Sequence, residues 1–314
     1  MKNYYISRSF IKTILYFDIF SYPLLEEEVI NYCNVPGIDP LVGRKVLEDL
    51  KKKHLINYFE GYYFIGEDNS VVDKRIEENK RAERRMKTAR IFARIISNFP
   101  YVRAVFISGS LSKHVMKNDS DIDFFIITES GRLWFCKALL TIFKRIVLVN
   151  SHRNFCLNYF IDTNTLSIPD RNVYTAAEIA FLLPMYNYVL YCKFLDANRW
   201  YRYDFPNKKE SNEILHIKPF GLKNLFELAC NNFLGKAFDQ LSYKVLTGFW
   251  KKKYNYLGEK KFSRNIQSSK NVSKFHPESY QERVLNNLEN KMREFEFSNG
   301  FLFAESMIPK SAIL

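Results

Sequence analysis

Apolar residues recur every three to four positions in three segments near the N-terminus, and this period predicts three helices. The segments cover residues 10–20, 24–33 and 40–55. Two short aromatic runs follow on either side of Glu60-Gly61, which is the signal of a β-hairpin. Three helices followed by a hairpin predict that residues 1–68 form a separate unit similar to a winged helix.

The pattern changes after this unit. A highly charged stretch, residues 70–98, predicts one long helix whose apolar positions become denser towards its end. Continuous apolar runs then predict buried strands at 102–108, 121–128 and 155–162, and an apolar helix at 132–149. The remaining sequence predicts mostly helix from 177 to 253 and a last amphipathic helix over 278–297. Thr175-Ala-Ala-Glu178 has the spacing of a capping box at the start of the first of these helices.

These elements predict an α/β (α+β) core with a mixed sheet, flanked by other domains. The expected parts are a winged-helix-like domain (1–68), a linker helix (69–98), the core (99–170) and a mainly helical C-terminal domain (171–314).

Composition and charge change this picture only in part. The chain has 314 residues and a formal net charge of +13, which favours anionic partners such as nucleic acid, nucleotides or an acidic membrane surface. Frequent Lys, Asn, Ile, Tyr and Phe fit a biased coding composition equally well. Five scattered cysteines without a CxxC pair predict reduced thiols and a cytoplasmic protein. No run approaches the roughly 18 to 20 uncharged residues of a transmembrane helix.

Two basic regions could contact a nucleic acid. Helix 40–55 carries five basic residues, and the irregular segment 244–274 carries nine against the single acid Glu259. The alternatives are an interaction or dimerisation module that only shares the winged-helix shape, and a solvated loop.

The most informative chemistry lies in "FISGSLSKHVMKNDSDIDFFIIT", residues 106–128. Asp121 and Asp123 are two positions apart on a strand, so their side chains share a face and repel each other at neutral pH. A divalent cation with hard oxygen ligands, such as Mg²⁺, removes this repulsion. Gly109 and Ser110 form a turn at the end of the preceding strand, whose amides and hydroxyl can bind phosphate, and Lys113 can offset phosphate charge.

This stretch resembles the DNA polymerase beta-like nucleotidyltransferase superfamily. The signature is a hydrophobic strand, Gly-Gly/Ser, a spacer of about nine to thirteen residues, and Asp/Glu–hydrophobic–Asp/Glu; the matching text is "FISGS…SDIDFFII". The resemblance implies that Asp121 and Asp123 hold Mg²⁺ on a nucleoside triphosphate, for which we expect ATP. It implies attack on the α-phosphate with pyrophosphate as the leaving group.

A third acid on the next strand completes the family's catalytic set, and here the sequence departs from the pattern. The middle of "FCLNYFID" presents Asn158, and the only acid is Asp162 at the end of the run. Asp162 is therefore expected either to be the third catalytic carboxylate or to initiate the loop at Thr163-Asn164. With Asn158 at the third position, activity would be weak, would need a base from elsewhere or would be absent.

The sequence thus predicts a cytoplasmic, Mg²⁺-dependent nucleotidyltransferase that acts on an unidentified small molecule, protein or RNA. The alternative is a non-catalytic DNA-binding or scaffold protein that uses the winged helix and keeps a degenerate nucleotide-binding core.

Overall fold

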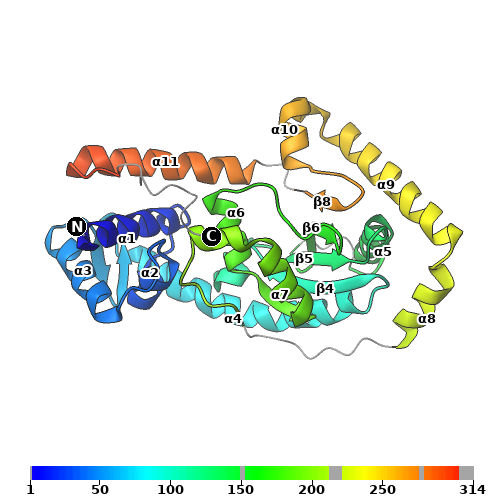
Figure 1. Ribbon diagram of the computed structural model, residues 1–314, viewed down its shortest axis with the longest axis horizontal. Helices are drawn as coiled ribbons and strands as arrows, with labels where there is room; N and C mark the ends of the chain where they lie inside the picture. The colour runs from blue at the N-terminus through cyan, green and yellow to red at the C-terminus, as the bar shows by residue number, and fades with distance from the viewer. Residues whose placement is uncertain (1, 149–152, 212–220, 276–278, 304–314) are drawn as a thin grey trace. The chain divides into compact units, whose positions relative to one another are not determined.

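The computed structural model describes residues 2–148, 153–211, 221–275 and 279–303 (Figure 1). By its internal contacts the chain divides into two compact units, each described here by itself. The first contains the described parts of 1–73, 205–207 and 282 onward, and the second contains 74–204 and 208–281. The segment after residue 204 is thus divided between the two units.

The first unit contains three helices and a small antiparallel sheet. The helices are α1 (Lys2–Asp18), α2 (Glu26–Tyr32) and α3 (Pro40–Lys52), and the sheet has the order β1-β3-β2 with β1 (Leu24–Leu25), β2 (Asn57–Phe59) and β3 (Tyr62–Phe64). Asp39 caps α3 by accepting hydrogen bonds from the backbone N–H groups of Leu41 and Val42, and Pro40 occupies the first turn, where its missing N–H costs nothing. Phe10, Val29 and Leu47, from the three helices, are fully buried between them.

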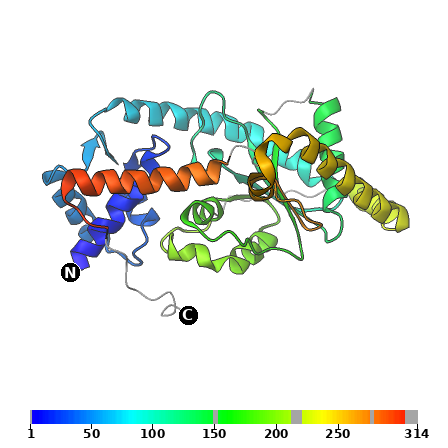
Figure 2. The same ribbon diagram turned by 90° about the horizontal axis from the view of Figure 1, so that it is seen from above.

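The last helix, α11 (Tyr280–Asn299), packs within this unit from residue 282 onward. Figure 2 shows α11 crossing α1 at an angle. Lys291 Nζ lies 2.6 Å from the carboxylate of Asp18, and the Phe301 ring contacts both Phe295 and Tyr4. The N-terminal unit therefore depends on a helix that is about 200 residues away in the sequence.

The second unit is built on a five-stranded mixed sheet with the order β7-β4-β5-β6-β8. Its strands are β4 (Val102–Ser108), β5 (Asp123–Thr128), β6 (Cys156–Asp162), β7 (Leu183–Tyr186) and β8 (Val272–Lys274). Only β5 and β6 are parallel, and α5 (Leu133–Ile146) connects them; all other neighbours are antiparallel. The mixed sheet is confirmed, but its edge strands β7 and β8 fall in segments expected to be helical or irregular.

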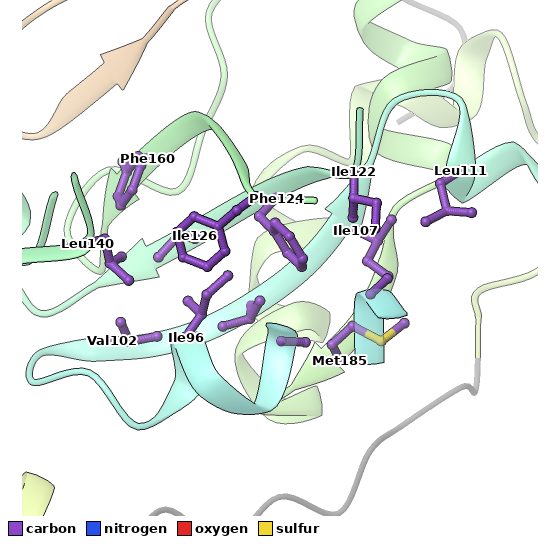
Figure 3. Close-up of a cluster of buried hydrophobic side chains, with 14 of the residues drawn as sticks. Ile96, Val102, Ile107, Leu111, Ile122, Phe124, Ile126, Leu140, Phe160 and Met185 are labelled. Atoms are coloured by element: carbon purple, nitrogen blue, oxygen red, sulfur yellow. The ribbon is translucent and has the colours of Figure 1, made fainter. Parts of the chain in front are cut away.

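Helices cover both faces of this sheet. On one face, Ile107, Phe124 and Ile126 of the strands pack with Ile96 of α4 (Ser70–Ser97) and with Leu140 of α5 (Figure 3). On the other face, the rings of Phe106 and Phe125 contact Phe194 of α7 (Tyr188–Ala197). Because both faces are covered, the central strands consist of unbroken apolar runs, which explains why the sequence predicts them well.

The remaining helices of this unit lie between β6 and β8 in the sequence. They are α6 (Val173–Ala180), α8 (Gly221–Cys230), α9 (Phe233–Lys253) and α10 (Gly258–Asn265), with short 3₁₀ turns at Leu111–Lys113, Arg199–Tyr203 and Asn255–Leu257. The predicted capping box at Thr175 is wrong. The helix begins two residues earlier, and Asn172 caps it by accepting a hydrogen bond from the Thr175 N–H (3.0 Å), so Glu178 is not used as a cap.

Candidate functional site

The turn after β4 and the start of β5 meet at one end of the sheet. The antiparallel register pairs Ser108 with Asp123, so Gly109 follows directly beside that carboxylate. Gly109 has φ +68°, and a Cβ atom built on it would lie 2.3 Å from Asp123 Oδ2. Two features therefore require a glycine at position 109: the left-handed backbone conformation and the close approach of the Asp123 carboxylate.

An amide, not an acid, faces Asp123 from the next strand. The pairing of β5 with β6 skips one residue between Leu157 and Tyr159, and this bulge leaves Asn158 opposite no partner. The Asn158 Nδ2 group donates a hydrogen bond to Asp123 Oδ1, and the Cys156 thiol donates one to Asn158 Oδ1 (3.1 Å). Asn158 thus occupies the place where the resemblance implies a third acid.

The pKa of Asp123 is raised to about 7, mainly by burial and also by the negative charges of Glu178 and Asp121, whereas a hydrogen bond with Cys156 lowers it. Asp121 is partly exposed, and among the described residues its carboxylate has no hydrogen bond or ion pair. The two acids repel one another, but nearby cations offset part of this charge: Lys113 lowers the pKa of Asp123, and Arg85 and Lys144 interact electrostatically with Asp121.

Lys113, in the turn after β4, and Glu178, on α6, contact the Gly109 turn at this end of the sheet. The Lys113 Nζ lies 2.8 Å from Glu178 Oε1 and donates to the Gly109 carbonyl (3.1 Å), and the Gly109 N–H donates to Glu178 Oε2 (3.3 Å). The Ser110 hydroxyl lies 3.9 Å from the sulfur of Met116. The carboxylate of Glu178 thus binds two of the donors that the sequence assigns to phosphate.

Asp162 does not belong to this site. It pairs with Thr128 at the opposite end of β5, five residues and roughly 16 Å along the strand from Asp123. It is fully buried and accepts hydrogen bonds from the backbone N–H groups of Gly131 (3.4 Å) and Asn164 (3.1 Å). The structure therefore does not bring Asp162 together with Asp121 and Asp123, and the alternative role of Asp162 in initiating the loop after β6 agrees with these bonds.

The Asp123 end offers two carboxylates, those of Asp121 and Asp123, as possible ligands for a cation. Across the described residues, no group of three or more Asp, Glu, His or Cys side chains is arranged to hold a metal ion. Asp121 and Asp123 alone would leave most positions of a Mg²⁺ ion to phosphate oxygens and water, which is how Mg²⁺ is commonly bound in nucleotide sites.

The basic regions are partly neutralised within the molecule. Three of the five basic residues on helix 40–55 form ion pairs, namely Arg44 with Glu26 (2.9 Å), Lys51 with Glu48 (3.1 Å) and Lys53 with Asp49 (2.8 Å). These ion pairs offset part of the positive charge of the helix. In segment 244–274, Lys274 pairs with Asp170 (3.0 Å), and the side chains of Lys260, Lys261 and Arg264 lie outside the described part.

Replacement of Gly109 tests the contact between the turn and the carboxylate. Gly109→Ala should lower the free energy of unfolding by about 2 kcal/mol or more, because it adds backbone strain and a clash with Asp123. Gly131→Ala is the matched control, since Gly131 has φ +66° and nothing within 4 Å of its built Cβ. Urea unfolding of both variants is the measurement. Equal losses of stability would contradict the contact.

The raised pKa of Asp123 predicts a pH dependence of stability. The folded protein holds this proton up to about pH 7, whereas the unfolded chain loses it near the ordinary value of about 3.9. Relative to Asp123→Asn, the wild type should therefore lose stability as pH rises from about 4 to 7, by at most about 1.4 kcal/mol per pH unit, with a plateau above. Chemical denaturation of the pair across this range is the measurement, and a difference that is independent of pH would refute the assignment.

Comparison with known proteins does not assign a family to the chain. No protein-family model, curated protein or solved structure matches the chain.

Proposed function

We propose that the Asp123 end of the sheet binds a nucleoside triphosphate with Mg²⁺ and transfers its nucleoside monophosphate to an acceptor. The acceptor oxygen forms a bond to the α-phosphorus, the bond from that phosphorus to the bridging oxygen breaks, and pyrophosphate leaves. The observation that carries the proposal is the direct approach of Asp123 to the Gly109 turn, with Asp121 two residues away.

Each part of the site has a role in this reaction. Asp121 and Asp123 would hold Mg²⁺, which when bound supplies the positive charge that offsets the triphosphate. The Gly109 N–H, the Ser110 hydroxyl and Lys113 would bind phosphate oxygens. The high pKa of Asp123 supports the proposal, because a buried carboxylate beside another acid gains most from a cation.

Glu178 competes with the phosphate in this proposal. Its two oxygens accept hydrogen bonds from the Gly109 N–H and from Lys113, so they must leave before a phosphate can take the same donors. Release also removes one of the negative charges that raise the pKa of Asp123. Nucleotide binding is thereby coupled to a movement of the Glu178 side chain on α6.

One observation favours a second candidate, a protein that binds Mg²⁺-nucleotide without turnover. Asn158 donates a hydrogen bond to Asp123 from the strand that carries the third acid in the superfamily. An amide neither takes up the acceptor's proton nor adds the charge for a second metal ion. Pyrophosphate release with a panel of sugars, RNAs and proteins as acceptors separates the two candidates, because both bind nucleotide and only the first releases pyrophosphate.

Thermal melting with nucleotides tests the shared binding site. Mg²⁺ and a triphosphate together should stabilise the protein by about 2.7 kcal/mol at about 100 times Kd, and either alone should give much less. Asp121→Asn and Asp123→Asn should abolish the shift, and Glu178→Ala should enlarge it because the competing carboxylate is gone.

Asp162→Asn is the matched control, since it alters an acid on the same sheet at the other end of β5 and should keep the full shift. A shift that survives both Asp121→Asn and Asp123→Asn, or that appears with duplex DNA and not with any nucleotide, would refute the proposed site.

A further inference from the structure

The outer side of α9 carries an uncovered apolar stripe. Leu234, Phe238, Leu241, Val245 and Phe249 follow one another at intervals of three or four residues, so they lie on one face of the helix. Their exposed fractions are 72, 36, 58, 59 and 50%. The stripe extends from Leu234 to Phe249, which is about 22 Å of helix. A row of this kind marks an interaction surface more strongly than single exposed apolar residues do.

The stripe is distinct from the face by which α9 packs on α5. The buried residues of α9 are Gly235, Ser242 and Trp250, and the Trp250 ring lies 5.8 Å from that of Trp134 on α5. Of the stripe residues, Phe238 also reaches α5 through Phe135, at 4.8 Å between ring centroids. In Figure 1, none of the described elements is drawn along the outer side of α9.

The charges beside the stripe are almost all positive. The exposed lysines of α9 are Lys236, Lys244, Lys251, Lys252 and Lys253. Helical spacing places Lys252 in line with the stripe and Lys244 at its border. The only acid of the helix, Asp239, accepts a hydrogen bond from the Phe135 N–H (2.7 Å) and therefore faces α5.

We propose that α9 lies on an anionic membrane surface, with the stripe in the interface and the lysines at the lipid phosphates. An apolar face bordered by lysines is the design of helices that bind in the plane of a membrane. Long lysine side chains can keep their charge in the headgroup layer while their stems lie beside the apolar face. No helix of the described chain is long and apolar enough to cross a membrane, so the contact is with the surface.

The composition of the stripe and its lysines disfavours two other binding partners, a second copy of the chain and a nucleic acid. Two copies of the stripe packed against each other would bury Lys252 without an acidic partner, which is costly. A nucleic acid would meet the lysines but would also have to cover five large apolar side chains that offer it no hydrogen bonds.

Vesicle co-sedimentation tests the proposal. The full-length protein should bind vesicles of phosphatidylcholine mixed with phosphatidylserine, and should bind pure phosphatidylcholine weakly. The variant Leu234→Gln/Leu241→Gln/Val245→Gln should bind at least about tenfold more weakly. Lys244→Gln/Lys252→Gln should also lose binding, by about fivefold for each lysine. These positions are exposed, so the variants should keep the wild-type circular dichroism spectrum.

Leu41→Gln/Val189→Gln is the matched control, because these residues are 68 and 67% exposed and lie on α3 and α7. It should bind anionic vesicles like the wild type. Three results would overturn the proposal: no binding to anionic vesicles, equal binding by the stripe variant, or a dimer in solution that the stripe variant abolishes while vesicle binding is unchanged.

Discussion

The Asp123 carboxylate lies between the Gly109 turn and the Asn158 amide, and the candidate site depends on this arrangement. A carboxylate can approach the turn so closely only because residue 109 has no side chain and adopts a left-handed backbone. The amide of Asn158 supplies a hydrogen bond but no charge, so burial keeps the pKa of the acid high. Ionisation of Asp123 in the free protein is therefore unfavourable below about pH 7.

Two local features of the backbone produce this arrangement. The antiparallel register of β4 and β5 places the turn beside the first residue of β5. The bulge in β6 brings Asn158 to the same place, because the extra residue turns its side chain towards Asp123. From α6, Glu178 then binds the turn itself, so one carboxylate lies on each side of the Gly109 turn. In the proposed function, a nucleotide with its cation would replace Glu178 and stabilise the ionised form of Asp123.

The sequence predicts the centre of the sheet and the first half of the site, for a physical reason. Strands β4 and β5 are covered on both faces, so they appear as unbroken apolar runs, and the glycine and the two aspartates stand out at their ends. Edge strands β7 and β8 have only four and three residues, too few to show a strand period. Helix α11 belongs to the N-terminal unit because it packs on residues far away in the sequence. Local sequence patterns do not predict such long-range packing.

The parts of the site that were mispredicted depend on register. A bulge is invisible in the sequence, so Asp162 and Asn158 could not be separated before the pairing of β5 and β6 was known. Glu178 was attributed to a capping box, because Thr175 stands three residues before it; in the structure Asn172 caps the helix and leaves Glu178 to the turn. The contact between this acid and the Gly109 turn is visible only once the fold is known.

The most direct test is an NMR titration of the Asp123 carboxyl carbon, identified by the signal that Asp123→Asn removes. Without ligand, the account predicts a pKa near 7, and with Mg²⁺ and a nucleoside triphosphate a pKa below the ordinary value of about 3.9. An ordinary pKa in the free protein, or a value near 7 that saturating Mg²⁺-nucleotide leaves unchanged, would contradict it.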